Sequence, residues 1–439
     1  MRECRSLEMM RTWHQDYGNT FQTILGRTLI VTIEPENIRA ILSRKFEDFD
    51  LGHFRNKSLE PLLGTGIFTS DGEAWKHSRA LVRPNFQRNL VADVEVYEKH
   101  VSKLISCLPK DGSMVDLQDL FFRMTIDSAT EFLFGESVDS LDCSSSEGSD
   151  LFAQNFDISQ KGLAIRTRLG PLMFLYRDKK FFQSTVEARQ YVHRFVQKAI
   201  AYRAAVDAGA ESEDLAPRYV FLHELSKQTQ DQKALTDQLL NILLAGRDTT
   251  ASLLTTTFFI LARRPDVWKK LRAEVLILKG RRPSFEDLKS LKYLKWVINE
   301  SLRLYPPVPV NSRTANKDTF LPVGGGPGGN EPLFVPKGRK VLYSIYCMHR
   351  LPELFGLDAT EFRPERWENL KPTWEFIPFN GGPRICIGQQ FALTETAYTV
   401  VRILQEFRDI ESRDPQPFNE KLTLIITSKN GCKVSLTPS

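Results

Sequence analysis

The stretch Phe379-Asn-Gly-Gly-Pro-Arg-Ile-Cys-Ile-Gly388 places a single cysteine among three glycines and a proline. Gly382 and Gly388 permit tight turns and a close approach of the backbone to another group. Because a helix is predicted to follow this loop, a thiolate at Cys386 would face backbone N–H groups and the positive end of a helix dipole. Arg384 adds positive charge nearby. The pattern favours a thiol with a lowered pKa, as a metal ligand requires; a buried cysteine in a glycine-rich turn is the alternative.

The rest of the chain indicates one large intracellular domain that spans residues 1–439. The sequence has no linker-like stretch and no internal repeat, and 41% of its residues are hydrophobic. Its net charge of +5 is interspersed, which argues against nucleic-acid binding and is compatible with an acidic partner or an anionic membrane surface. The six cysteines have no metal-binding spacing and indicate reduced thiols. No apolar run has the ~20 residues of a membrane helix, and none resembles a signal peptide.

Helical periodicity dominates the chain, and one predicted helix is unusually long. It runs from Thr236 to Arg264 with no proline and one glycine, and Pro265 stops it. Its length is ~40 Å at ~1.5 Å per residue. The middle of this helix, Leu244–Ala251 (LAGRDTTA), contains residues that weaken an α-helix. We therefore expect a local distortion there, and such distortions often mark a functional site.

Strand-like runs from both ends of the chain predict a smaller β region in a mainly α protein. Asn430-Gly431 separates the last two runs and is typical of a β-hairpin turn. The glycine run at 324–329 lacks the Gly-Lys-Ser/Thr ending of a phosphate-binding loop and predicts a turn. The strand-like runs span residues 23–33, 333–335, 340–345, 422–427 and 432–436.

Two further pairs of residues have the spacing of one helix face. Glu300 and Arg303 lie three residues apart among apolar neighbours. We expect them to form a buried ion pair that Arg366 supports with additional hydrogen bonds; a solvated surface pair is the alternative. Trp75 and Arg79 lie four residues apart, so that an indole N–H and a guanidinium can donate to one anion. For this second pair the alternative is an ordinary amphipathic helix.

Taken in order, these motifs resemble the cytochrome P450 superfamily. Its haem loop, Phe-x-x-Gly-x-Arg-x-Cys-x-Gly, is matched at every defined position, and its Glu-x-x-Arg pair falls on Glu300 and Arg303. The resemblance implies the cytochrome P450 fold, with haem b between the long central helix and the loop of Cys386, whose thiolate is the axial ligand to the iron. Glu300, Arg303 and their third partner Arg366 would be structural. The other haem-binding residues that the resemblance implies are Trp75, Arg79, Arg313, Phe379 and Arg384.

The resemblance also implies an oxygen-activating site and a substrate pocket. The family motif Ala/Gly-Gly-x-Asp/Glu-Thr-Thr/Ser is matched by Ala245-Gly-Arg-Asp-Thr-Thr250. Asp248 and Thr249 would therefore be catalytic and would guide protons during oxygen activation. Thr249 could instead simply bond the carbonyl of Ala245, as helical threonines commonly do. An apolar pocket over the haem would be lined by Phe68, Leu244, Ala245, Val308, Pro309 and Val310.

A narrower resemblance is to the fungal alkane and fatty-acid hydroxylases. It implies a monooxygenase that uses O2 and electrons from NADPH through NADPH–cytochrome P450 reductase. The substrate would be a small apolar molecule: a long-chain alkane, a fatty acid or an alkyl-bearing fungal metabolite. Those enzymes lie at the cytosolic face of the endoplasmic reticulum membrane, and the resemblance implies the same location here. Their N-terminal anchor is absent from this sequence, which begins near the start of their catalytic domain. Either the sequence is truncated, or this member contacts the membrane only through its surface. The resemblance rests on Leu62–Gly72, Trp75–Arg79, Ala245–Ala251, Leu321–Gly326 and Phe379–Gln390.

Two other functions would use the same cofactor. A haem-thiolate isomerase or dehydratase would act on lipid hydroperoxides without a reductase. The intact pair of Asp248 and Thr249 argues against it, because such an enzyme does not need a proton relay. A haem-binding sensor would make no product. Dependence of turnover on NADPH and a reductase would distinguish a monooxygenase from the isomerase or dehydratase. Formation of any product would distinguish it from the sensor.

Overall fold

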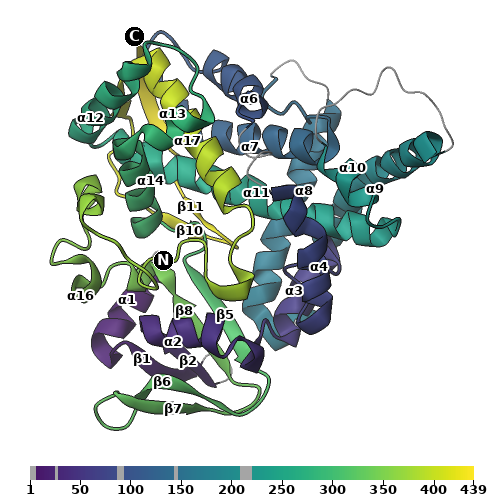
Figure 1. Ribbon diagram of the computed structural model, residues 1–439, viewed down its shortest axis with the longest axis vertical. Coiled ribbons are helices and arrows are strands. Elements are labelled where there is room, and N and C mark those ends of the chain that lie inside the picture. Colours follow the sequence, from purple (N-terminus) through teal and green to yellow (C-terminus); the bar gives the residue numbers. More distant parts are fainter. Residues whose placement is uncertain (1–5, 25–27, 87–92, 143–146, 208–219) are drawn as a thin grey trace.

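Helices make up most of the protein and strands gather in a smaller region, which confirms the predicted mainly α fold class (Figure 1). The computed structural model describes residues 6–24, 28–86, 93–142, 147–207 and 220–439. The turn of the hairpin predicted at 23–33 lies outside the described residues, but the two strands on either side of it pair as expected, with Thr20 opposite Thr32.

The longer elements have the following bounds. The helices are α1 (Ser6–Tyr17), α2 (Pro35–Arg39), α3 (His53–Leu63), α4 (Gly72–Val82), α6 (Glu95–Ser106), α7 (Leu117–Phe134), α8 (Glu147–Leu169), α9 (Lys179–Asp207), α10 (Phe221–Ser226), α11 (Gln232–Leu261), α12 (Pro265–Val275), α13 (Phe285–Ser290), α14 (Lys292–Leu304), α15 (Ile345–Met348), α16 (Pro352–Phe355) and α17 (Gln389–Glu406). The strands are β1 (Thr20–Ile24), β2 (Thr28–Thr32), β3 (Phe49–Asp50), β4 (Val115–Asp116), β5 (Val310–Ala315), β6 (Thr319–Gly325), β7 (Glu331–Val335), β8 (Lys340–Ser344), β9 (Phe407–Ser412), β10 (Glu420–Leu422), β11 (Ile426–Ser428) and β12 (Lys433–Pro438).

The long predicted helix is α11, which runs through the middle of the helical part (Figure 1). Asp231 caps its N-terminus by accepting hydrogen bonds from the backbone N–H groups of Lys233 and Ala234. The helix begins at Gln232, before the predicted Thr236, and ends at Leu261, before the predicted Arg264. Pro265 then begins α12, as expected of a proline at the first position of a helix. The expected distortion of its middle is wrong, because α11 is continuous there. Packing of α7, α9 and α17 along the helix outweighs the weak propensity of the central residues.

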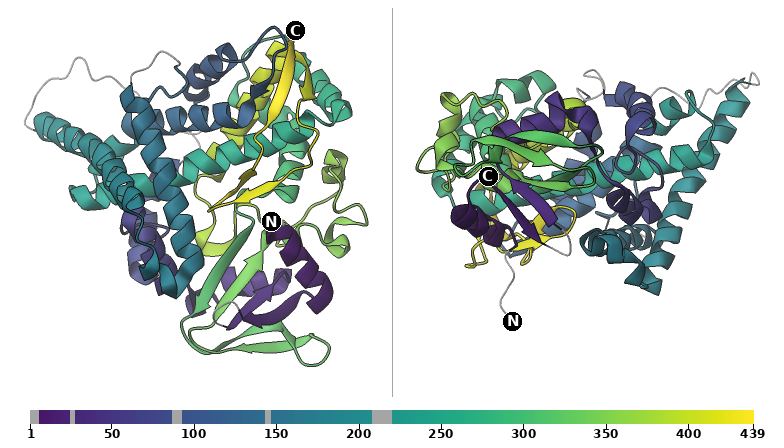
Figure 2. Two further views of the ribbon diagram at one scale, coloured as in Figure 1. Left: turned by 180° about the vertical axis from the view of Figure 1, so that it is seen from behind. Right: turned by 90° about the horizontal axis from the view of Figure 1, so that it is seen from below.

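Five strands from distant parts of the chain form the main sheet, in the order β1-β2-β8-β5-β3. β2 and β8 run parallel, with Leu29 opposite Lys340, and the other neighbours run antiparallel. The N-terminal strands and the strands that follow α14 therefore lie side by side, as all views show (Figures 1 and 2). The hairpin of β6 and β7 belongs to the same region.

The hairpin predicted around Asn430-Gly431 does not form. β11 pairs with β10, whereas β12 pairs with β9 and β4. The run 422–427, expected as one strand, contains the turn between β10 and β11. Gly431 has a φ of +80° and lies so close to the Asp116 carboxylate that a Cβ would collide with it. This glycine therefore serves a tertiary contact rather than a hairpin turn.

Two hydrophobic clusters form the core. The larger one lies among the helices, including α7, α11 and α17, and the smaller one lies between the main sheet and the helices near it. The segment that carries the cysteine loop crosses from one cluster to the other. Ile377 is buried in the smaller cluster, whereas Phe379 and Ile387 pack against the larger one. The loop is thus held between the two cores.

No helix among the described residues is long and apolar enough to span a membrane. Cys347, Cys386 and Cys432 are free thiols. Their state agrees with the expectation from the sequence that these cysteines are not paired.

Candidate functional site

The backbone of the loop itself holds Cys386 in place just before α17. The N–H of Cys386 donates to the carbonyl of Phe379 (3.0 Å), and the N–H of Ile385 donates to that of Gly382 (3.0 Å). Gly382 has a φ of +67°, and a Cβ at this position would collide with the carbonyl oxygen of Leu42. Only glycine therefore allows this close approach of the loop to the segment that follows α2.

The Cys386 thiol faces an internal space. Its accessible surface classes it as exposed, yet burial by surrounding protein raises its pKa. The N–H of Gly388 and the guanidinium of Arg79 act in the opposite direction, but burial is the larger influence. The expected lowering of the thiol pKa is therefore wrong for the polypeptide alone, and Arg79 rather than Arg384 supplies the positive charge. A metal ion would itself deprotonate a thiol that binds it.

One face of the middle of α11 also has accessible surface. Nearly all of the helix after Ala234 is buried, but Ile242, Leu244, Ala245, Gly246 and Thr249 are half-buried. The spacing of three and four residues puts all of these except Leu244 on one stripe, and a Cβ at Gly246 would meet no atom within 4 Å. A helix that crosses the core has such a stripe only where the interior leaves room for another molecule.

Trp75, Arg79 and Arg384 come together beside the loop. Arg384 Nη2 donates to Asp71 Oδ1 (2.8 Å), and its guanidinium lies 4.3 Å from the centroid of the Trp75 ring. Arg79 lies 5.9 Å from the same ring, and its Nη1 donates to the carbonyl of Ile385 (3.0 Å). α4 thus places both of its motif residues against the loop that carries the cysteine.

Arg313 adds a second buried guanidinium group from β5. Its side chain is 2% exposed, and its Nη1 donates to Asn311 Oδ1 (3.3 Å) and to the carbonyl of Ser312 (2.9 Å). Burial and then the charge of Arg313 lower the pKa of Arg384 to about 9. Among the described residues, the Nε atoms of Arg313 and Arg384 have no hydrogen-bond partner. Buried N–H donors without a partner favour the binding of an acceptor such as an anion.

Asp248 and Arg247 are buried neighbours in the middle of α11. Arg247 Nη1 lies 3.5 Å from Asp248 Oδ1 and also pairs with Asp157 of α8, whose side chain is 46% exposed. Burial raises the pKa of Asp248 to about 6, against the lowering effect of Arg247. Within the described residues, Asp248 Oδ1 has no hydrogen-bond partner. This carboxyl group can therefore hold a proton near neutral pH, and Arg247 connects it to a surface carboxylate.

The hydroxyl of Thr249 donates to the carbonyl of Ala245 (2.6 Å). The bond named as the alternative for this residue is therefore present. The Thr249 side chain also lies on the half-buried stripe of α11, where its oxygen can still accept a hydrogen bond. A catalytic role for Thr249 stays a prediction.

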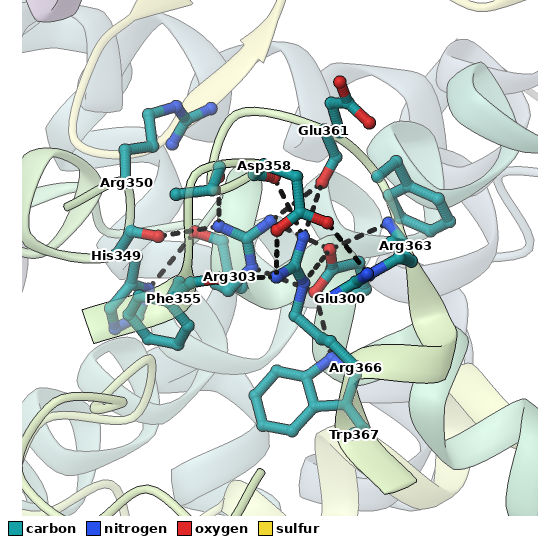
Figure 3. Close-up of polar contacts among 12 residues, drawn as sticks. Glu300, Arg303, His349, Arg350, Phe355, Asp358, Glu361, Arg363, Arg366 and Trp367 are labelled. Carbon is teal, nitrogen blue, oxygen red and sulfur yellow. Dashed lines mark hydrogen bonds and ion pairs between the residues drawn. The ribbon is translucent and has the colours of Figure 1, made fainter. Parts of the chain in front are cut away.

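Glu300, Arg303 and Arg366 come together in the interior (Figure 3). Arg303 Nη2 lies 2.8 Å from Glu300 Oε1, and neither side chain is exposed. Arg366 Nε donates to the same oxygen (2.9 Å), and Trp367 Nε1 donates to the other (3.0 Å). The N–H of Arg363 provides a further donor (2.9 Å). These hydrogen bonds offset the cost of removing the charges from water.

His349 connects this network to the cysteine loop. Its Nε2 accepts from the N–H of Ile377 (3.1 Å), so Nδ1 carries the proton and donates to the carbonyl of Arg303 (3.2 Å). Burial and the charge of Arg303 lower the pKa of His349 to about 3. The imidazole is therefore neutral at physiological pH. The carbonyl of Ile377 accepts from Asn380 N (2.9 Å), inside the loop.

Nearly the whole chain matches one family of known proteins. The sequence profile described as Cytochrome P450 covers residues 4–435. This chain belongs to the cytochrome P450 family. The cytochrome P450 monooxygenase himC of Aspergillus japonicus is 49% identical over 99% of this chain and 79% of its own length. Cytochrome P450 52A3-B of Candida maltosa is 48% identical over 94% of this chain and 82% of its own length. The protein is accordingly a monooxygenase of the oxidoreductase class.

Cytochromes P450 bind haem b through a cysteine thiolate, and the residues of this P450 fit that cofactor. The thiol of Cys386 faces an internal space and so is free to bind iron. Arg313 and Arg384 have buried donors without partners, as two haem propionates require. Which residues contact the propionates stays a prediction, since the expected roles of Trp75 and Arg79 rest on their position in the motif.

The residues predicted to line a substrate pocket come from segments that hydrogen bonds attach to α11. The N–H of Phe68 donates to Asn241 Oδ1 (3.1 Å), one turn before Leu244 and Ala245. Ser252 Oγ donates to the carbonyl of Ile426 (2.6 Å), whose N–H donates to the carbonyl of Pro307 (3.0 Å). This bridge sets the distance between α11 and the next three residues, Val308, Pro309 and Val310. Their contact with substrate stays a prediction.

Sequence reasoning missed three residues near this site. Arg247 stands at the variable position of the α11 motif, where its pairing with Asp157 could not be foreseen. Leu424 lies in the turn between β10 and β11 and packs against the larger core cluster, but its run was expected to form one strand. Arg55 of α3 belongs to no motif, and only the fold brings it near Arg313.

Proposed function

We propose that this cytochrome P450 hydroxylates a long-chain alkane, a fatty acid or an alkyl-bearing fungal metabolite, with O2 and with electrons that NADPH–cytochrome P450 reductase transfers from NADPH. The half-buried stripe of α11 carries the proposal, because Ile242, Ala245 and Gly246 offer an interior surface that is apolar. Ligand pockets are mostly apolar with few polar anchors. The resemblance to fungal alkane and fatty-acid hydroxylases adds the long alkyl chain.

The polypeptide contributes binding and proton transfer to this reaction. When bound, haem supplies the chemistry of oxygen activation. Cys386 would hold its iron as a thiolate, the ligand type that favours cleavage of the O–O bond. Burial raises the pKa of Asp248 to about 6, so its carboxyl group can take up and release a proton close to physiological pH, and the Thr249 hydroxyl can pass one on from the half-buried face of α11. The resemblance to the fungal alkane and fatty-acid hydroxylases supports the proposal that a reductase supplies the electrons.

A binding screen followed by turnover tests this proposal. Alkanes, fatty acids and polyketides are titrated into the purified holoprotein while the shift of the Soret band is recorded. Long-chain compounds should give the largest shift, and product should form only with both NADPH and reductase. If small charged molecules gave the largest shift and long-chain compounds none, the proposal would fall. Conversion of lipid hydroperoxides without reductase would favour the isomerase or dehydratase.

The same proposal places the enzyme at the cytosolic face of the endoplasmic reticulum membrane. The segment between α8 and α9 supports contact with a membrane surface. Leu172, Phe174 and Leu175 in this segment are 52%, 65% and 60% exposed. Exposed basic side chains flank them, namely Arg168, Arg177, Lys179 and Lys180. Apolar side chains surrounded by cations suit an anionic lipid surface.

A further inference from the structure

Arg55 has a fixed position beside the main sheet. Gly52, just before α3, has a φ of +94°, and a Cβ there would lie 2.6 Å from Thr314 Oγ1 of β5. The start of α3 therefore packs directly on β5. Asp71 holds it from the other side, because its carboxylate accepts from the N–H of Leu51 (2.8 Å) and from Asn56 Nδ2 (2.9 Å). The same carboxylate accepts from Arg384, so α3 and the cysteine loop share one anchor.

The guanidinium of Arg55 has N–H donors that its hydrogen bond within the described residues does not use. Its Nη1 donates a long hydrogen bond to Asn311 Oδ1 (3.5 Å), and Arg313 Nη1 donates to the same oxygen (3.3 Å). No carboxylate among the described residues forms an ion pair with Arg55 or with Arg313. Burial, and then the charge of Arg313, lowers the pKa of Arg55 to about 10. Arg55 thus remains short of an anionic partner.

Three guanidinium groups lie near two carboxylates here. Burial and then the charge of Arg313 lower the pKa of both Arg55 and Arg384, and Asp71 and Asp50 act in the opposite direction. Within the described part of the chain, Arg384 alone of the three forms an ion pair, with Asp71. The polypeptide therefore holds more positive charge in this region than it neutralises. Such an excess in a partly buried place is stabilised by an anion from a bound molecule, and a guanidinium fork suits a carboxylate.

We propose that Arg55 binds a carboxylate of the haem, a propionate, together with Arg313 and Arg384. The residue lies outside the motifs by which the family is recognised, and its position follows from the contacts of Gly52 and Asp71. Its fork supplies two parallel donors, which a lysine cannot reproduce. Because Arg55 is fixed before the cofactor arrives, its hydrogen bonds require little ordering on binding.

The test compares Arg55→Gln with Arg55→Lys and with the control Lys57→Gln. Lys57 lies on the same helix, is exposed and forms an ion pair with Glu60 (2.8 Å). Transfer of haem from each holoprotein to an excess of apomyoglobin is followed by absorbance, and the reduction potential of the iron is measured by titration. Arg55→Gln should lose haem roughly tenfold faster, the effect of removing one charge-assisted hydrogen bond. Its potential should fall, because loss of a nearby positive charge stabilises the oxidised iron.

The other variants separate charge from geometry. Arg55→Lys should keep the potential of the wild type but lose haem at an intermediate rate, and it provides the measurement if Arg55→Gln does not accumulate. Equal haem loss and equal potential in Arg55→Gln and Lys57→Gln would overturn the proposal. A second arm titrates a long-chain fatty acid and the alcohol of the same length. If only the fatty acid bound more weakly to Arg55→Gln, with haem loss unchanged, the residue would serve a substrate carboxylate and the haem proposal would be wrong.

Discussion

Thr249 donates its hydroxyl proton to the carbonyl of Ala245 and still faces the half-buried side of α11. If it also passes protons, Thr249→Ala should keep its haem and its substrate affinity but lose coupling. Product per NADPH should fall while hydrogen peroxide in solution rises, and general acid–base steps contribute about 10²–10⁴-fold. Thr255 makes the same bond to Ala251 (2.7 Å) in a fully buried part of the helix, so Thr255→Ala is the matched control. Unchanged coupling in Thr249→Ala would leave it an ordinary helical residue.

Asp248 should make stability depend on pH. Burial raises its pKa from the ordinary 3.8 to about 6. The folded state then binds this proton more tightly than the unfolded state, and the resulting stability is complete below pH 3.8 and lost as the pH rises through about 6. The shift corresponds to roughly 3 kcal/mol. Asparagine at position 248 does not titrate. The free energy of unfolding of Asp248→Asn minus that of wild type should therefore increase by about this amount as the pH rises from 4 to 7.

Urea unfolding of both proteins at the two pH values measures this difference. Asp266 offers a control of opposite sign, because a hydrogen bond from Arg264 lowers the pKa of its carboxyl. The free energy of unfolding of Asp266→Asn minus that of wild type should therefore decrease as the pH rises. The decrease should be small, since Asp266 is exposed. If the difference in free energy of unfolding between Asp248→Asn and wild type did not change with pH, the carboxyl group of Asp248 would have its ordinary pKa in the folded protein.

α14 depends on Glu300 for its attachment to the segment that follows α16. Removal of this carboxylate would leave the buried guanidinium of Arg303 without a counter-charge and that of Arg366 with Asp358 alone, at a cost of about 3–5 kcal/mol. We expect that Glu300→Ala fails to accumulate as holoprotein, as measured by haem absorbance per unit of protein. Glu60→Ala, which breaks an exposed ion pair on α3, should accumulate normally. A stable, haem-loaded Glu300→Ala with only altered kinetics would contradict a structural role.

Sequence patterns predicted the elements whose signals are local. The start of α12 at Pro265 follows from the missing N–H of proline, and the length of α11 follows from its lack of breakers. Asn430-Gly431 misled the strand prediction, because the preference of this pair for a hairpin turn was overruled by the contact of Gly431 with Asp116. Pairing between β12 and β9 joins strands whose partnership no local pattern reveals.

The same limit applies to the site. The cysteine loop and the α11 motif could be found in the sequence, since the required residues stand together there. The net direction of the Cys386 pKa could not, because it depends on how much protein surrounds the thiol. Arg55 and Arg247 were missed for a related reason: their partners, Asn311 and Asp157, come from other elements.

At the scale of the whole molecule, the surface between α8 and α9 should attach the enzyme to lipid. Burial of one large apolar side chain contributes ~1.5–3 kcal/mol. Replacement of Leu172, Phe174 and Leu175 by serine should therefore weaken binding to anionic vesicles by more than about tenfold, as measured by co-sedimentation. Leu276 and Ile277 are also exposed, 45% and 72%, and their replacement by serine is the control. Equal binding of the two variants would place the lipid contact elsewhere.

The contact of Gly382 with the carbonyl of Leu42 bears on the timing of haem uptake during synthesis by the ribosome. The loop that presents Cys386 takes its shape against a segment that the ribosome makes long before the loop itself. A growing chain therefore cannot retain the cofactor until this loop has left the ribosome. Haem thus enters after the loop has been made, and a cell short of haem would accumulate apoprotein in which synthesis has already passed this point.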